Sequence, residues 1–207
     1  MKPATTAILS ALAEEQQGLL ELMLAPRRVT RAGRDFWLGE LHGQPVVLAL
    51  SRIGKVAAAT TATTLIEAFG AQRLVFTGVA GGIAGGVNVG DVVVASEFVQ
   101  HDMDASPIFP RYQIPLYGRE RFVCDAALSA LLRAAAHEGL AGLVRETGTL
   151  NGVAGHTVHQ GLIASGDRFV SAADESRVLH ETLTRAGHAA LASNVVSASS
   201  QAKRSRP

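Results

Sequence analysis

The chain has 207 residues, 47% of them hydrophobic, 18% charged and 5% aromatic, which is typical of one compact globular domain. The formal net charge is only +1 and includes Lys203, Arg204 and Arg206 near the C-terminus, so no basic stripe predicts a nucleic-acid partner. No apolar run reaches the roughly 18 residues of a membrane span, the single Cys124 excludes an internal disulfide, and we expect a cytoplasmic protein.

Strands and helices alternate in the first part of the chain. Glu14 and Glu15 follow the first predicted strand at once, and acidic residues are favourable in the first turn of a helix. The other reading of this pair is a carboxylate at a strand end that acts as a general base. In chain order we predict a strand over 6–12, a helix ending at Pro26, hairpin strands over 35–41 and 45–50, and a helix over 56–69 rich in Ala and Thr.

The segment 77–104 is the most informative part of the sequence. A buried strand over 73–76 leads into it, and a second strand over 92–95 lies within it. Five glycines separate the two strands: Gly78, Gly81, Gly82, Gly85 and Gly86. Glycines near a strand end let the backbone turn sharply and approach a ligand closely, and ligands of α/β proteins bind at the carboxyl ends of strands. The segment is therefore a candidate floor for a small-molecule site, with a purely structural loop as the alternative.

Two nucleotide-binding motifs are excluded for this glycine segment. A strand follows Asp91 where a dinucleotide fingerprint would open a helix, and the Lys of a Walker loop is absent. His101, Asp102 and Asp104 match no strong zinc spacing, so a polar strand end is the better reading of that group.

The second half predicts further strands and helices. Asp125 is expected to cap a helix with one leucine-rich face, and a buried strand over 161–165 precedes a polar turn. In that turn, Asp167 either orients the loop or faces a ligand. A helix is expected from Asp174, and a strand opening at 189–192 is not expected to continue. The histidines at 137, 156, 159, 180 and 188 are expected to face solvent, and the serine-rich, basic stretch 193–207 to be disordered.

Four segments together resemble the 5′-methylthioadenosine/S-adenosylhomocysteine nucleosidases of the purine nucleoside phosphorylase superfamily. They are Ile8–Glu15, Ser51–Ala58, Thr77–Asp104 and Gly161–Val170. The resemblance extends from residue 6 to about residue 192. It implies an α/β fold, namely a three-layer α/β/α sandwich with a central mixed sheet, in a family domain over 1–192. It implies hydrolysis of the N-glycosidic bond with release of adenine, and no metal or organic cofactor.

The resemblance also assigns site residues, position by position. Glu15 matches the glutamate that activates the attacking water, and Ile53 matches a wall of the alkylthio pocket. Val79, Ala80 and Gly81 match the loop under the ribose and the water, with Val79 where some relatives have serine. Phe169 matches the aromatic ring that stacks on the purine, and Val170 the residue whose backbone reads the adenine edge. The loop 105–115, from Ala105 to Pro115, matches the one that enters the partner's site in the family's homodimer.

After Ala192 the sequence departs from the family pattern. Relatives continue with Val-Glu-Met-Glu, which holds the ribose, and later with a Ser-Asp pair that protonates the purine. This chain has Ser-Asn-Val-Val at 193–196. We interpret the tail 193–207 as a non-family segment produced by truncation or a frameshift, which leaves the fold incomplete and predicts impaired activity.

Three other functions stay open at this stage. A phosphorolytic nucleoside phosphorylase would need arginines near the glycine segment, and Arg52 is the only nearby candidate. A futalosine hydrolase would perform closely related chemistry. A non-catalytic nucleoside-binding remnant or dimer partner would bind a nucleoside without releasing the base.

Overall fold

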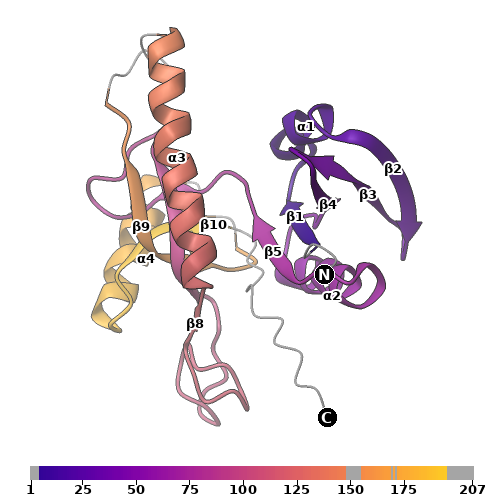
Figure 1. Cartoon of the computed structure of the whole chain (residues 1–207). Coiled ribbons are helices and arrows are strands. Elements are labelled where there is room, and N and C mark those ends of the chain that lie inside the picture. Colours follow the sequence, from indigo (N-terminus) through magenta and orange to yellow (C-terminus); the bar gives the residue numbers. More distant parts are fainter. Residues whose placement is uncertain (1–4, 148–154, 169, 171, 195–207) are drawn as a thin grey trace. The chain divides into compact units, whose positions relative to one another are not determined.

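The computed structural model describes residues 5–147, 155–168, 170 and 172–194 (Figure 1). These residues separate into two compact units, the first up to Val79 and the second over Ala80–Asn194. Each unit contains one mixed five-stranded sheet with two helices, so the predicted α/β class is confirmed. Within the described ranges, no helix is long and apolar enough to cross a membrane.

The sheet of the first unit has the strand order β2-β3-β4-β1-β5. Strand β1 is parallel to β4 and β5, whereas β3 pairs antiparallel with both β2 and β4. The predicted hairpin is β3 and β4, and its turn has the left-handed backbone at His42 and Gly43 that suits a tight connection. The elements are β1 (Thr6–Ser10), α1 (Ala13–Glu21), β2 (Leu24–Arg31), β3 (Arg34–Leu41), β4 (Gln44–Leu50), α2 (Lys55–Phe69) and β5 (Arg73–Phe76).

One strand of this unit was not predicted. The first helix ends at Glu21, and Pro26 lies in β2 instead of ending the helix. The register of β2 against β3 shifts between Leu24 and Arg27, so Pro26 lies at an irregularity of an edge strand, where the missing N–H is tolerated. The exposed residues of β2 give no apolar alternation, which explains why the pattern did not reveal it.

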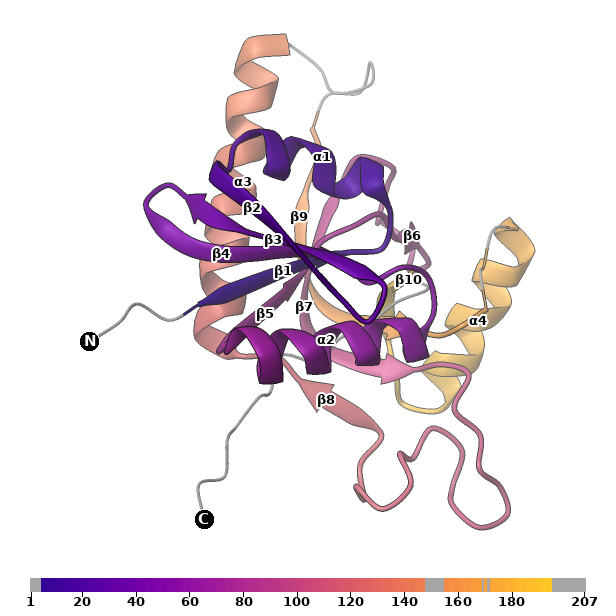
Figure 2. The same cartoon turned by 90° about the vertical axis from the view of Figure 1, so that its right-hand side faces the viewer.

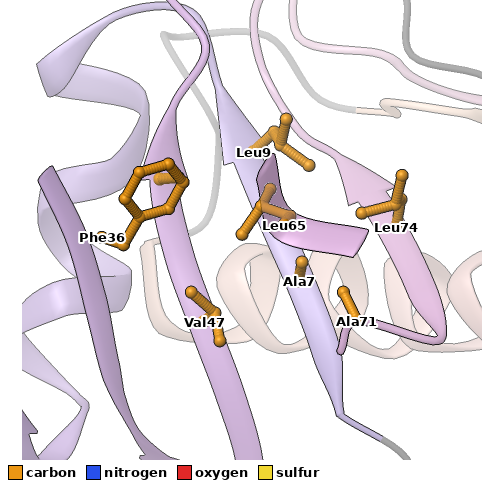
Figure 3. Packing of buried hydrophobic residues seen from close by; sticks show 8 residues of the cluster. Ala7, Leu9, Phe36, Val47, Leu65, Ala71 and Leu74 are labelled. Atoms are coloured by element: carbon orange, nitrogen blue, oxygen red, sulfur yellow. The ribbon is translucent and has the colours of Figure 1, made fainter. Parts of the chain in front are cut away.

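The first unit forms three layers because residues of its central strands alternate between two apolar faces. Ala7 and Leu9 of β1 pack with Leu65 of α2 on one face (Figure 3). Leu48 packs with Met23 and with residues of α1 on the other face. The sheet therefore lies between α1 and α2, which Figure 2 shows on opposite sides of the strands.

The sheet of the second unit has the strand order β6-β10-β9-β7-β8. Strands β10, β9 and β7 are parallel, and the short outer strands β6 and β8 are antiparallel to their neighbours. Leu183 of α4 is fully buried and packs in one cluster with Leu162 and Ala164 of β9. The elements are β6 (Gly81–Gly82), β7 (Val92–Gln100), β8 (Arg121–Val123), α3 (Ala126–Thr147), β9 (Val158–Ser165), α4 (Ala173–Arg185) and β10 (Ala190–Asn194).

The last described strand corrects the prediction that the strand opening at 189–192 does not continue. Strand β10 runs on through Ser193 and Asn194, two residues of the predicted tail. It pairs with β9 on one side and with β6 on the other, so backbone hydrogen bonds support small polar residues that no apolar pattern marks. The remaining predicted tail, 195–207, lies outside the described residues, and the domain boundary at 192 stays a prediction.

Three of the five histidines predicted to face solvent are buried or partly buried against acidic residues. The side chains of His156 and His188 are only 2% and 1% exposed, and His159 is 22% exposed. His156 and His159 face Asp91, which the sequence did not indicate because the three residues come together only when β7 and β9 pair. His180 is also partly buried, with its Nδ1 3.3 Å from the Ala190 carbonyl oxygen, whereas His137 is exposed, as predicted.

Candidate active site

Three segments that the sequence assigns to the site lie together at the carboxyl ends of parallel strands in the first sheet. Strands β4, β1 and β5 are parallel neighbours, so the loops that follow them leave from the same edge. The pairing continues just beyond the strands, because Ser51 N–H donates to the Ser10 carbonyl at 2.8 Å and Thr77 N–H to the Leu9 carbonyl at 2.9 Å. Ile53 and Val79 belong to the loops after β4 and β5, and Glu15 lies in the first turn of α1, directly after the β1 loop.

The carboxylate of Glu15 is held by three backbone donors. Oε1 accepts the N–H of Val79 at 2.8 Å, and Oε2 accepts the N–H groups of Ala11 and Leu12 at 2.9 and 3.0 Å. Leu12 is the N-cap of α1 and has no side-chain acceptor, so Glu15 satisfies N–H groups that the helix start would otherwise leave unpaired. Hydrogen bonds to an ionised acceptor are among the strong ones, and together they fix the position of this carboxylate.

Gly78 explains how the β5 loop comes so close to Glu15. A Cβ at this position would lie 2.7 Å from Glu15 Oε1 and 2.9 Å from its Cδ, closer than real Cβ atoms come. A carboxylate offers about four lone-pair sites, and three backbone N–H groups occupy three of them. One acceptor site is left for a water molecule, so the helix-start role and the general-base role of Glu15 are compatible.

The other residues at these strand ends differ in exposure and in hydrogen bonding. Ile53 is 61% exposed and Val79 is 81% exposed, so both present apolar surface. Arg52 has a left-handed backbone, with φ 64°, and its guanidinium donates to the Gly33 carbonyl in the turn between β2 and β3 at 2.9 Å. That contact engages the one arginine that the phosphorolytic alternative had available.

The remaining glycines of the segment belong to the second unit, where Gly81 and Gly82 have strand partners. Gly81 and Gly82 form β6, and Gly81 pairs with Ser193 of β10. A Cβ at Gly82 would lie 3.0 Å from the Val87 side chain, and Gly86 has φ 89° in the following turn. The segment continues into strand β7, which confirms that it is not a dinucleotide fingerprint. Ala80 directly precedes β6 and is exposed.

The loop after β9 lines a cavity of about 460 Å³ in the second unit. Val170 and Arg168 contribute to this cavity, together with His101, Asp102 and Tyr112. Phe169, the predicted purine-stacking residue, lies outside the described residues. The structure therefore places Val170 at a cavity, whereas the predicted roles of both residues stay predictions.

A contact that the sequence did not predict organises this loop. Asp102 Oδ2 accepts the N–H of Asp167 at 2.7 Å, so the backbone of Asp167 is tied to the residue pair that follows β7. The bond uses the backbone of Asp167, so both readings of its side chain, loop orientation and contact with a ligand, stay predictions. The signal available in the sequence was an acidic residue after one strand and a Ser-Gly-Asp turn after another, but their adjacency requires the sheet topology.

The predicted partner-site loop, 105–115, exposes Ile108 at 81%, whereas its Tyr112 and Ile114 side chains are buried. Leu116 and Tyr117, which directly follow the loop, are 93% and 66% exposed. Ala105 accepts the N–H groups of Ile108 and of Phe109 at 3.1 Å, and the turn after Pro115 closes between Ile114 and Arg119. The loop has its own hydrogen bonds, and together with the turn that follows it presents the apolar side chains of Ile108, Leu116 and Tyr117.

The acidic residues after β7 do not form a metal site among the described residues. Asp104 accepts the N–H and the hydroxyl of Ser106 at 3.0 and 2.6 Å, whereas Asp102 is bound to Asp167. No group of three or more His, Cys, Asp or Glu side chains suited to a metal ion occurs in the described parts of the chain.

Asp91 forms a separate polar cluster just before β7. Its carboxylate accepts the N–H groups of Asn88 and Thr157 at 2.9 and 2.8 Å and contacts His159 Nε2 at 2.9 Å. These hydrogen bonds, the one from Asn88 foremost, lower the pKa of Asp91 to about 2. The cluster lies at the amino ends of β7 and β9, at the opposite end of these strands from Asp102, and ties the preceding loops together.

Comparison with known proteins identifies the family. The sequence profile of the phosphorylase superfamily matches residues 5–195. The chain is 36% identical over 173 residues to a 5′-methylthioadenosine/S-adenosylhomocysteine nucleosidase of Anoxybacillus flavithermus, covering 83% of this chain and 67% of the relative. It is 31% identical over 180 residues to an aminodeoxyfutalosine nucleosidase of Helicobacter pylori, covering 83% and 69%.

A solved structure gives the same result for the fold. A 5′-methylthioadenosine/S-adenosylhomocysteine nucleosidase of Neisseria meningitidis, in complex with methylthio-immucillin-A, superposes with a TM-score of 0.80 at 32% identity. The match covers 95% of this chain and 77% of that one, which confirms the nucleoside phosphorylase-like fold. The chain belongs to the phosphorylase superfamily and, within it, to the family of 5′-methylthioadenosine/S-adenosylhomocysteine nucleosidases.

Proposed function

We propose that this protein hydrolyses the N-glycosidic bond of 5′-methylthioadenosine or S-adenosylhomocysteine and releases adenine. The observation that carries the proposal is the Glu15 carboxylate, fixed by three backbone N–H groups at the carboxyl edge of parallel strands. The names of the nucleosidase relatives support the same bond and the same substrates.

Glu15 suits the role of general base for the attacking water. Cleavage of a glycosidic bond passes through an oxocarbenium-like state, which a correctly placed water then captures. Three backbone contacts hold the carboxylate still, and its remaining acceptor site can receive a proton from that water. Val79, Ala80 and Gly81 would lie under the ribose, Ile53 would contact the alkylthio group, and Phe169 and Val170 would hold the purine.

An aminodeoxyfutalosine nucleosidase is the second candidate. The similarity to the Helicobacter pylori protein of that name favours it, and the reaction would also break an N-glycosidic bond. Phosphorolysis is less well supported, because Arg52 is bound to the Gly33 carbonyl. With the first candidate we also propose a role in methionine salvage, which depends on methylthioadenosine being the substrate.

We also propose that the protein works as a homodimer in which the loop from Ala105 to Pro115 enters the partner's site. The exposed Ile108 of the loop, and Leu116 directly after it, supply apolar surface for such a contact. Light scattering of the purified chain tests the dimer, and Ile108→Asp combined with Leu116→Asp should shift it toward a monomer. Unchanged dimer content in that variant would contradict this use of the loop.

The deciding experiment is base release from a set of nucleosides, with and without inorganic phosphate and in isotopically labelled water. Release of adenine from methylthioadenosine without phosphate, with label in the sugar product, supports the proposal. Faster release from aminodeoxyfutalosine favours the second candidate. A requirement for phosphate points to a phosphorylase, and binding without release points to the non-catalytic reading.

A further inference from the structure

The loop after β9 begins between two parallel neighbours. Strands β7 and β9 are in register up to Gln100 and Ser165, and His101 N–H continues the pairing by donating to the Ser165 carbonyl at 2.9 Å. On the other side, Gly166 N–H donates to the Asn194 carbonyl of β10 at 3.3 Å. The start of the loop is therefore held by backbone bonds on both sides.

Asp102 adds a side-chain bond at the next residue of the loop. Its Oδ2 accepts the N–H of Asp167 at 2.7 Å, a contact between residues 65 positions apart. The short distance is typical of a hydrogen bond to an ionised acceptor. Beyond it, Arg168 donates to Glu175 in the first turn of α4 at 2.9 Å, but these two side chains are 65% and 42% exposed and contribute little.

Gly166 shows that the contact with the β7 end is tight. A Cβ on Gly166 would lie 2.9 Å from Asp102 Oδ2 and 2.7 Å from Cε1 of the His101 ring, and closer still to its Nε2. His101 is 6% exposed, so its ring cannot move away easily. Asp102 and His101 therefore fill the space beside Gly166 and fix the chain at the start of the loop.

We propose that Asp102 is a positioning residue for substrate binding, acting through the backbone of Asp167. Its carboxylate holds Asp167 at the start of the loop, and Arg168, Val170 and Asp102 itself line the 460 Å³ cavity. The inference rests on the proposed function, since the loop is the one expected to bind the purine. Asp102 touches no reacting atom in this scheme.

The test compares Asp102→Ala with Asp102→Asn and with Asp125→Ala. Asp125 provides the matched control, because its carboxylate also accepts a backbone N–H, that of Leu128, at 2.8 Å, but at the start of α3. For Asp102→Ala we expect the KM for methylthioadenosine to rise roughly tenfold or more, as for loss of a hydrogen bond to a charged group, with kcat changed less. Asp102→Asn keeps an acceptor oxygen and should lie between wild type and Asp102→Ala.

Hydrogen exchange of the Asp167 amide supplies a readout that does not depend on activity. In Asp102→Ala this amide should exchange roughly tenfold faster or more, whereas in Asp125→Ala it should not change. Unchanged exchange in Asp102→Ala would overturn the proposal, and so would faster exchange with unchanged KM. An equal rise of KM in Asp125→Ala would reduce the effect to general destabilisation and would also overturn it.

The outcome separates this inference from the proposed function. If the wild type releases no base, the proposed function fails, and adenine binding measured by calorimetry replaces KM. Weaker adenine binding in Asp102→Ala, with faster exchange of the Asp167 amide, then still supports positioning of a purine-binding loop. Absence of adenine binding in the wild type, or equal binding in both proteins, overturns the inference.

Discussion

The two units repeat one arrangement at the carboxyl ends of parallel strands. In the first unit, Glu15 follows β1 and accepts the N–H of Val79, which comes after Gly78 at the end of β5. In the second unit, Asp102 follows β7 and accepts the N–H of Asp167 at the end of β9. Gly78 and Gly166 precede the two donors, and neither has room for a Cβ beside its carboxylate.

The difference between the two arrangements lies in what else the carboxylate does. Glu15 stands in the first turn of α1 and accepts two more N–H groups from the start of that helix. Asp102 is in a loop, beside the buried His101. In both units a carboxylate beside a glycine helps to fix a loop after a strand, whereas Glu15 is itself fixed by the additional contacts that suit a general base.

The largest expected difference between Glu15 and Asp102 appears when each carboxylate is replaced with its amide. Glu15→Gln keeps the size of the side chain and one acceptor oxygen but cannot accept the proton of a water, so kcat should fall roughly 10²–10⁴-fold. Asp102→Asn should leave kcat within about threefold of wild type. Steady-state kinetics with methylthioadenosine measures both. Similar losses of kcat in the two variants would show that the carboxylates do not differ in role.

The next largest expected effect is on stability, when the glycine beside each carboxylate is replaced. Gly78→Ala and Gly166→Ala should each lower the free energy of unfolding by about 1–3 kcal/mol. The added methyl group collides with the Glu15 carboxylate at Gly78, and with the His101 ring and the Asp102 carboxylate at Gly166. The matched control is Gly18→Ala in α1, where no atom lies within 4 Å of the added Cβ. That variant should be more stable by about 0.5–1 kcal/mol.

Urea unfolding of the three glycine variants supplies the measurement. A Gly78→Ala or Gly166→Ala protein as stable as wild type would mean that the loops relax freely and are not fixed by these contacts. Loss of stability in Gly18→Ala would show that alanine is poorly tolerated for reasons other than the proposed collisions.

Asp91 is a third carboxylate that accepts backbone N–H groups, but it lies at the amino ends of β7 and β9, away from the predicted site residues. Its pKa is lowered to about 2 from 3.8, so its contribution to stability is complete above pH 3.8 and is lost as the pH falls toward 2. Asp91→Asn should lower the free energy of unfolding at neutral pH by roughly 1–2 kcal/mol, after allowance for solvent screening.

Unfolding measured from neutral pH to about pH 2 checks this expectation. The difference between wild type and Asp91→Asn should shrink across the acid range, while KM at neutral pH stays unchanged. A constant difference at all pH values would mean that the ionised carboxylate is not the source of the stabilisation.

Local sequence patterns were sufficient to predict much of the first unit. Glu15 directly follows a buried strand, and Gly78 follows another, so both could be placed at strand ends from the sequence alone. What could not be predicted was which strands are neighbours, since β1 pairs with β5 across more than 60 residues. The Glu15–Val79 bond is a consequence of that pairing.

The second unit was predicted less completely for the same physical reason. Asp102 and Asp167 lie 65 residues apart, and only the parallel pairing of β7 with β9 brings them together. The end of β10 could not be predicted because Ser193 and Asn194 are polar. Backbone pairing of β10 with two neighbouring strands, β6 and β9, supports it instead. His188 was expected to face solvent, but burial lowers its pKa despite the nearby Glu120 carboxylate, which acts in the opposite direction.

The place of β10 in the second sheet has a consequence for synthesis on the ribosome. All strands of the first sheet have left the ribosome once Phe76 has emerged. Strand β6 can pair only after Ala192 and Ser193 have been synthesised, about 110 residues after Gly82. At typical translation rates of roughly 5–20 residues per second, the glycine segment remains without its strand partner for about 5–20 seconds. We expect nascent chains arrested before β10 to resist proteolysis up to Phe76 and to be cut readily at the glycines that follow.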